Sequence, residues 1–76
     1  MTYLIDKHGD QVDCSAESVR IYVRDPNDGS RILRNNSRDM LFEWCRENCS
    51  GGYWIGMGFG QFELGNDAVL FKMRWG

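Results

Sequence analysis

The chain has few of the residues on which covalent cross-links and acid–base catalysis depend. Its 76 residues include three cysteines and one histidine, His8. An odd number of cysteines at irregular spacing predicts no disulfide framework and favours a reducing compartment. A single histidine in an expected tight turn has no local partner that could activate a serine or a cysteine. We therefore expect a protein that is not an enzyme and that carries no cofactor or metal.

Long apolar runs are also missing. No stretch approaches the roughly 20 apolar residues of a membrane-spanning helix, and the N-terminus lacks the apolar segment of a signal peptide. The composition, 42% apolar and 26% charged, is typical of a globular chain. These features predict one domain over residues 1–76, located in the cytoplasm (the host cytoplasm if the protein is viral), with no membrane partner.

Neither sign of charge dominates, but charge is unevenly distributed. The net charge is −2, which gives no overall attraction to nucleic acid. Residues 18–38 contain five arginines against two aspartates, whereas acidic side chains outnumber basic ones in residues 1–17 and 39–67. The sequence therefore places a basic segment between two acidic ones.

Alternation of apolar and polar side chains predicts a strand over residues 18–24. Its apolar positions are Val19, Ile21 and Val23. Two shorter strands are expected before it, at residues 2–6 and 11–14.

The segment after this strand carries the strongest turn signal in the sequence. Residues 25–30 (DPNDGS) end near Gly29, which suits the left-handed position of a turn. We therefore expect residues 31–34 to return as the partner strand of a hairpin. Arg24 would then lie opposite Arg31, a like-charge pair that is unfavourable unless something neutralises it.

A helix is predicted over residues 36–49, with Asn36 as its N-cap and Gly51 as the residue that ends it. Its apolar residues cover one broad arc: Met40, Leu41, Phe42, Trp44, Cys45 and Cys49. On the opposite side, acidic side chains recur at every fourth position without a lysine between them: Asp39, Glu43 and Glu47.

Residues 51–76 are expected to form a second hairpin, around which the core is organised. The cluster 65–67 (Gly-Asn-Asp) is a turn signal between two apolar runs. After it, alternate apolar side chains predict a strand: Val69, Phe71, Met73 and Trp75. The expected register places Phe62 opposite Phe71, and the bare backbone of Gly58 and Gly60 leaves room for bulky neighbours.

Together these elements predict an α+β fold. A small antiparallel sheet built of hairpins packs against one α-helix, in the order β-β-β-β-α-β-β.

Two motifs that could form ligand sites favour structural interpretations instead. The glycine-rich segment 56–60 does not fit the spacing GxGxxG of a phosphate-binding loop because position 61 is glutamine, and a strand rather than a helix is expected to follow it. One histidine and three cysteines could supply zinc ligands: His8, Cys14, Cys45 and Cys49. Because the two helical cysteines are needed for the core, we expect buried thiols without a metal.

Two exposed surfaces are candidate binding sites. The first is a protein-binding surface that combines the acidic helix row with an apolar strip, and consists of Asp39, Glu43, Glu47, Ile55, Met57 and Phe59. Tyr53 belongs to the same strip, which one helix cannot cover in the expected register. The second is a nucleic-acid-binding surface that combines arginine with an aromatic side chain, and consists of Arg20, Tyr22, Arg24 and Arg31.

In size and turn-rich composition, the whole chain resembles the small stand-alone proteins that phages encode to disable host machinery, anti-CRISPR proteins among them. The resemblance includes no diagnostic motif. It implies a non-catalytic inhibitor that blocks a functional surface of a larger protein or nucleoprotein complex. The alternative is a small RNA- or DNA-binding regulator that uses residues 18–34, and the sequence leaves a homodimer open.

Overall fold

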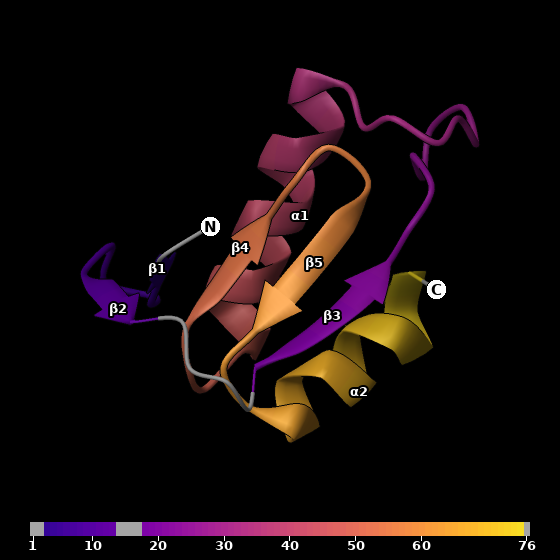
Figure 1. Ribbon diagram of the computed structural model, residues 1–76. Helices are drawn as coiled ribbons and strands as arrows, with labels where there is room; N and C mark the ends of the chain where they lie inside the picture. The colour runs from indigo at the N-terminus through magenta and orange to yellow at the C-terminus, as the bar shows by residue number, and fades with distance from the viewer. Residues whose placement is uncertain (1–2, 14–17, 76) are drawn as a thin grey trace.

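The computed structural model describes residues 3–13 and 18–75, which form five strands and two helices (Figure 1). In chain order the elements are β1 (Tyr3–Ile5), β2 (Gln11–Asp13), β3 (Val19–Tyr22), α1 (Asn35–Asn48), β4 (Tyr53–Ile55), β5 (Phe59–Phe62) and α2 (Gly65–Trp75). The predicted α+β class is confirmed. The predicted order differs from this one in the fourth strand and in the last one, as described below.

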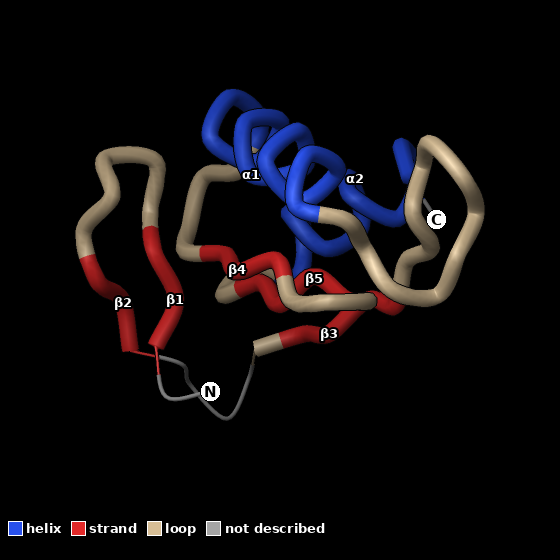
Figure 2. The backbone as a smooth tube through the Cα atoms, turned by 90° about the horizontal axis from the view of Figure 1, so that it is seen from above, coloured by secondary structure: helices blue, strands red, loops and turns tan. Residues whose placement is uncertain are grey.

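All strands belong to one antiparallel sheet in the order β2-β1-β4-β5-β3. Both helices lie on the same side of its β4-β5-β3 part (Figure 2). Helix α1 packs against β4, and α2 packs against β3 and β5. The β1–β2 hairpin therefore forms one edge of the sheet, and β3 forms the other.

Strand β3 and the residues after it confirm the alternation predicted for residues 18–24. The apolar side chains are turned toward the core: Val19, Ile21 and Val23. The polar side chains between them are exposed: Arg20, Tyr22 and Arg24.

The partner strand predicted at residues 31–34 does not form, so this part of the prediction is wrong. The turn itself is present, with Gly29 at a φ of 75° as expected. Strand β3 pairs with β5 instead, over four residue pairs. The chain reaches the tip of the β4–β5 hairpin on both sides of the turn: before it the Val23 N–H donates to the Gly58 carbonyl, and after it the Leu33 N–H donates to the Met57 carbonyl. It then leads directly into α1.

Helix α1 begins at Asn35, and the predicted N-cap, Asn36, is wrong. The N-cap is Arg34, whose side chain makes no capping hydrogen bond. The Asp25 carboxylate instead holds the N-cap residue in place, because the Arg34 N–H donates to Asp25 Oδ2 at 3.0 Å. The helix ends at Asn48, close to the predicted end. Its start is thus specified by a tertiary contact rather than by its own first residue.

Helix α2 is the largest difference, because we predicted a strand over residues 69–75. The hairpin turns earlier, at residues 56–58, and the chain is helical from Gly65 onward. Residues at helical spacing pack on the core: Ala68, Phe71 and Trp75. Val69 and Met73, which fit only the alternating pattern, are 57% and 79% exposed. The predicted strand is wrong because the helical period, not the period of two, describes which residues are buried.

One predicted contact is nevertheless present in another form. The rings of Phe62 and Phe71 lie 4.9 Å apart, but they join β5 to a helix rather than to a strand. Gly60 provides the space, because a Cβ there would lie 2.8 Å from the Phe62 ring and 3.3 Å from the Phe71 ring. Phe71 also meets Trp44 of α1 edge-on at 6.0 Å. These aromatic contacts connect both helices to the sheet.

A buried carboxylate ties α2 to the connection that follows α1. Asp67 is 2% exposed and accepts the N–H groups of Ser50 at 3.1 Å and Gly51 at 2.9 Å. Glu63, just after β5, accepts the N–H of Gly52 at 2.9 Å. Three successive amides before β4 therefore find their acceptors in the chain that follows β5.

Candidate functional site

A cleft of about 610 Å³ lies between α1 and the loop of the β1–β2 hairpin. Its wall is aromatic and comes from α1 and β4: Phe42, Tyr53 and Trp54. The Trp54 ring meets Phe42 edge-on at 5.3 Å and Tyr3 at 6.2 Å. Because these rings support one another within the protein, the wall is formed before any ligand arrives.

Charged and titratable side chains surround this wall. Helix α1 supplies Asp39, Glu43 and Arg46, and the β1–β2 loop supplies Asp6, Lys7 and His8. Glu43 and Arg46 approach to 3.7 Å, but both are largely exposed, so this pair contributes little. In the part of the chain that the structure describes, no cation lies within ion-pair distance of Asp39. The cleft thus places the Asp39 carboxylate, which forms no ion pair within the described residues, beside an aromatic wall.

The predicted acidic row of α1 is exposed along its length, at Asp39, Glu43 and Glu47. Only the first two line the cleft, and Glu47 lies outside it. The row is therefore divided between a concave surface and an open helix face.

The predicted apolar strip does not form one surface. Ile55 is fully buried and Tyr53 is 3% exposed, so the prediction that Ile55 binds a partner is wrong. Met57 is 61% exposed at the hairpin tip, whereas Phe59 is half-buried. Because Ile55 pairs with Gly60, Ile55 and Phe59 point to opposite faces of the sheet.

The residues of the predicted nucleic-acid surface lie at the other edge, on β3 and just after it. A pocket of about 300 Å³ is lined by Tyr22, Val23, Arg24, Arg31 and Gly58. Arg20 lies beside this pocket on the same strand, and its guanidinium stands 4.1 Å from the centre of the Phe59 ring. Its Nε donates to Gln61 Oε1 at 2.9 Å. The structure therefore brings together all four residues at one edge, although the predicted hairpin is absent.

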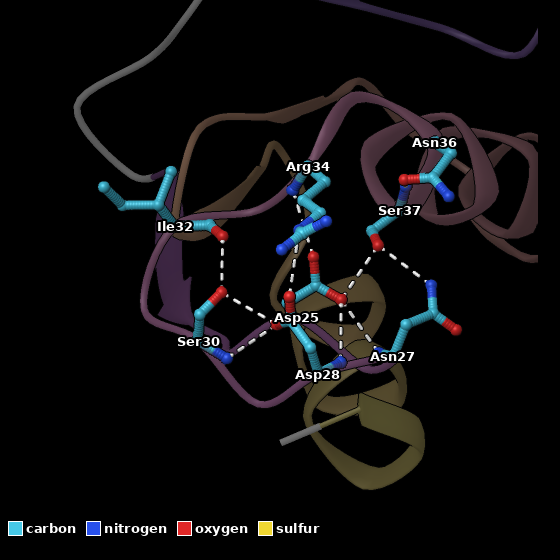
Figure 3. Close-up of polar contacts among 8 residues, drawn as sticks. All are labelled: Asp25, Asn27, Asp28, Ser30, Ile32, Arg34, Asn36 and Ser37. Atoms are coloured by element: carbon cyan, nitrogen blue, oxygen red, sulfur yellow. Dashed lines mark hydrogen bonds and ion pairs between the residues drawn. The ribbon is translucent and has the colours of Figure 1, made fainter.

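A buried carboxylate fixes the segment 23–34, which we call the arginine loop (Figure 3). Asp25 is 2% exposed and accepts hydrogen bonds from the N–H groups of Arg34 and Asn27 and from the hydroxyl of Ser37. These bonds, that of the Arg34 N–H above all, lower the pKa of Asp25 to about 2. The arginine loop is thereby joined to the first turn of α1.

The cysteines that the structure describes belong to the core. Cys45 and Cys49 are 0% and 6% exposed and carry free thiols. The contact with the Cys49 thiol, together with burial, raises the pKa of Cys45. Cys14 lies outside the described residues, and His8 is exposed. Over residues 3–13 and 18–75 no group of three or more His, Cys, Asp and Glu side chains is placed to hold a metal ion.

Three residues that shape these sites were not found from the sequence. Phe42 and Trp54 form part of the cleft wall; the sequence pattern places Phe42 only in the apolar arc of the helix and predicts no role for Trp54. The position of Phe42 between Asp39 and Glu43 in sequence was the available signal. Asp25 had been interpreted as an ordinary turn residue, and nothing local indicates that its carboxylate is buried.

Comparison with protein-family models, with curated proteins and with solved structures finds no match to this chain. Neither of the helices within the described ranges is long and apolar enough to cross a membrane.

Proposed function

We propose that the protein is a non-catalytic binding protein whose cleft takes up a cationic side chain, arginine or lysine, from a partner protein. The observation that carries this proposal is the juxtaposition of an aromatic wall with the carboxylates of Asp39 and Glu43. A cation gains from the face of an aromatic ring and from a carboxylate at the same time. The volume of about 610 Å³ is in the range of small-ligand sites, so a long basic side chain fits.

Such binding gives a simple mode of action. Protein surfaces that hold nucleic acid are rich in arginine and lysine, so a protein that sequesters these side chains competes with the nucleic acid. This is inhibition by occlusion and requires no bond to be made or broken. The proposal agrees with the resemblance to small phage proteins, anti-CRISPR proteins among them, that block host complexes from within the host cytoplasm.

Nuclear magnetic resonance can test the proposal with short peptides. A peptide containing one arginine is compared with the same peptide containing citrulline, which has the shape of arginine without its charge. We expect the arginine peptide to shift the indole N–H resonance of Trp54, because that ring lines the cleft. The indole signals of Trp44 and Trp75 serve as internal references.

Two variants locate the site on the acidic row. Asp39→Asn combined with Glu43→Gln should weaken arginine-peptide binding about fivefold or more, the value of roughly 1 kcal/mol of charge and cation–π interaction. Glu47→Gln is the matched control, since it removes charge from the same helix but outside the cleft. Equal losses in both variants, or equal binding of the citrulline peptide, would contradict the proposal.

A further inference from the structure

Two arginines of the arginine loop, Arg24 and Arg31, line one pocket, and neither forms an ion pair with the described residues. Arg34 pairs with Asp28 at 3.0 Å, and Arg38 donates to a β4 carbonyl, so these arginines are used within the fold. Arg24, whose Nη1 donates to the exposed Gly29 carbonyl at 3.4 Å, and Arg31 both line the 300 Å³ pocket. Over the described ranges, neither has a carboxylate within ion-pair distance. Two guanidinium groups in one concave site repel each other until an anion lies between them.

The conformation that creates this site is fixed by the fold. The buried Asp25 carboxylate holds the arginine loop through its hydrogen bonds, so Arg24 and Arg31 are set on a preformed frame. The floor of the pocket includes Gly58, where a Cβ would lie 2.7 Å from the Arg31 carbonyl oxygen. Any side chain at that position would push the arginine loop away. The pocket is thus a built feature of this edge.

Aromatic side chains continue the surface along the sheet. Tyr22 is 74% exposed and lies opposite Phe59 in the ladder between β3 and β5. Arg20 covers the Phe59 ring and is held in place by Gln61, whose Nε2 donates to the Ser18 hydroxyl at 2.7 Å. The exposed Tyr22 ring and the flat guanidinium of Arg20 are both platforms on which a base can stack. Both helices lie on the other side of these strands (Figure 2).

We propose that this edge of the sheet binds single-stranded nucleic acid, with one phosphate between Arg24 and Arg31 and an adjacent base stacked on Tyr22. The charge of the pocket selects an anion, and the neighbouring ring selects a base that is free of its complement. A duplex keeps its bases stacked inside and offers nothing to Tyr22. The site is independent of the cleft between α1 and the β1–β2 loop, because the two share no lining residue and β5 separates β4 from β3 in the sheet.

Fluorescence anisotropy with a labelled single-stranded oligothymidylate, and with a duplex of the same length, tests the inference on the full chain. We expect binding of the single strand that weakens steeply with salt and little binding of the duplex. The salt slope should decrease by about 0.7 for each phosphate contact that is removed. Arg24→Ser combined with Arg31→Ser should reduce affinity at least tenfold and flatten this slope.

Two further variants distinguish binding at this pocket from a general attraction of nucleic acid to positive charge. Lys72→Ser removes an exposed cation of α2, outside the pocket, and should leave binding within about twofold. Tyr22→Thr keeps a residue that favours strands and should reduce affinity roughly fivefold or more without changing the salt slope. If the double arginine variant and Lys72→Ser lose binding equally, or if the duplex binds as well as the single strand, the inference is wrong. Failure here leaves the peptide test of the cleft unaffected, because its readout and its variants are different.

Discussion

The two edges of the sheet are stabilised in different ways. At the β3 edge a buried carboxylate, Asp25, joins the arginine loop to α1. At the other edge β1 pairs with β4 through a single residue pair, Ile5 opposite Tyr53. The β1–β2 loop is organised by Asp6, which accepts the N–H groups of His8 and Asp10 at the protein surface. Leu4 anchors β1 in the interior, so the difference lies in the loops: a buried carboxylate fixes the arginine loop, and a carboxylate at the surface organises the β1–β2 loop.

This difference suits the two binding roles proposed for these edges. A phosphate is a small ligand of constant shape, and a pocket that is fixed in advance loses little entropy when it binds. The cleft combines a preformed aromatic wall with a loop held by surface hydrogen bonds, and such a loop can adjust to a partner side chain that arrives in a varying context. The fold therefore combines a pocket fixed by a buried carboxylate with a cleft of which one side is a surface loop.

The largest effect is expected where both edges depend on the same support. Phe71 is fully buried and contacts β5 and α1, so Phe71→Ala should lower the free energy of unfolding by about 3–5 kcal/mol. In so small a chain this approaches the whole stability, and both edges should unfold together. Chemical denaturation followed by tryptophan fluorescence measures the change.

The control for this experiment is Met73→Ala. Met73 is 79% exposed on α2, and its substitution should change stability by no more than about 0.5 kcal/mol. In a strand, Phe71 and Met73 would share one face and be affected alike. Similar losses in both variants would therefore argue against the helix.

A smaller effect, confined to one edge, is expected from Asp25→Asn. Both oxygens of the carboxylate accept hydrogen bonds, and an amide nitrogen in place of one of them leaves at least one of these donors without an acceptor. The amide resonances of the arginine loop should shift and broaden, while those of the β1–β2 hairpin stay in place. Asp10→Asn at the other edge is the matched control for charge.

Acid should reproduce this change in the wild type. The folded pKa of Asp25, about 2, lies below the ordinary value of 3.8. The stabilisation is therefore complete above about pH 4 and is lost as the pH falls toward 2, where the carboxylate takes up a proton. If loosening of the arginine loop begins near neutral pH instead, another group is responsible.

The smallest effect is a difference in hydrogen exchange that requires no substitution. The Arg34 N–H donates to a buried carboxylate, whereas the His8 and Asp10 N–H groups donate to a surface one. After each rate is divided by the rate of an unstructured peptide, we expect the Arg34 N–H to exchange at least tenfold more slowly than those of His8 and Asp10. Exchange at Arg34 requires the arginine loop to leave α1. Equal protection at the two edges would remove the contrast between them.

Local patterns predicted the elements whose burial is decided locally. The alternation of residues 18–24 specified β3, and the apolar arc of residues 36–49 specified α1 to within a residue or two at each end. The α+β class followed from these elements. The acidic row and the arginine surface were also predicted correctly as exposed, because charged side chains remain at the surface unless they are paired.

The remaining features depend on contacts between distant residues. Residues 65–75 carry apolar side chains that partly fit both a period of two and a helical period, since Phe71 and Trp75 satisfy each of them. What decides between the two is the position of the hairpin turn at residues 56–58, which leaves the following chain free to form a helix. The burial of Asp25 and the cleft between α1 and the β1–β2 loop have no local signature, so the sequence alone could not place them.

The acceptors of the connection before β4 have a consequence for the order in which the chain can fold during synthesis. The N–H groups of Ser50, Gly51 and Gly52 rely on Asp67 and Glu63, which are translated later. A nascent chain that stops before residue 63 can form the turns and the first helix only transiently. The acceptors of these amides and the Phe71 side chain that fills the core have not yet been synthesised. Residues 3–62 should therefore reach their native arrangement only after residues 63–75 have left the ribosome, in a single late step.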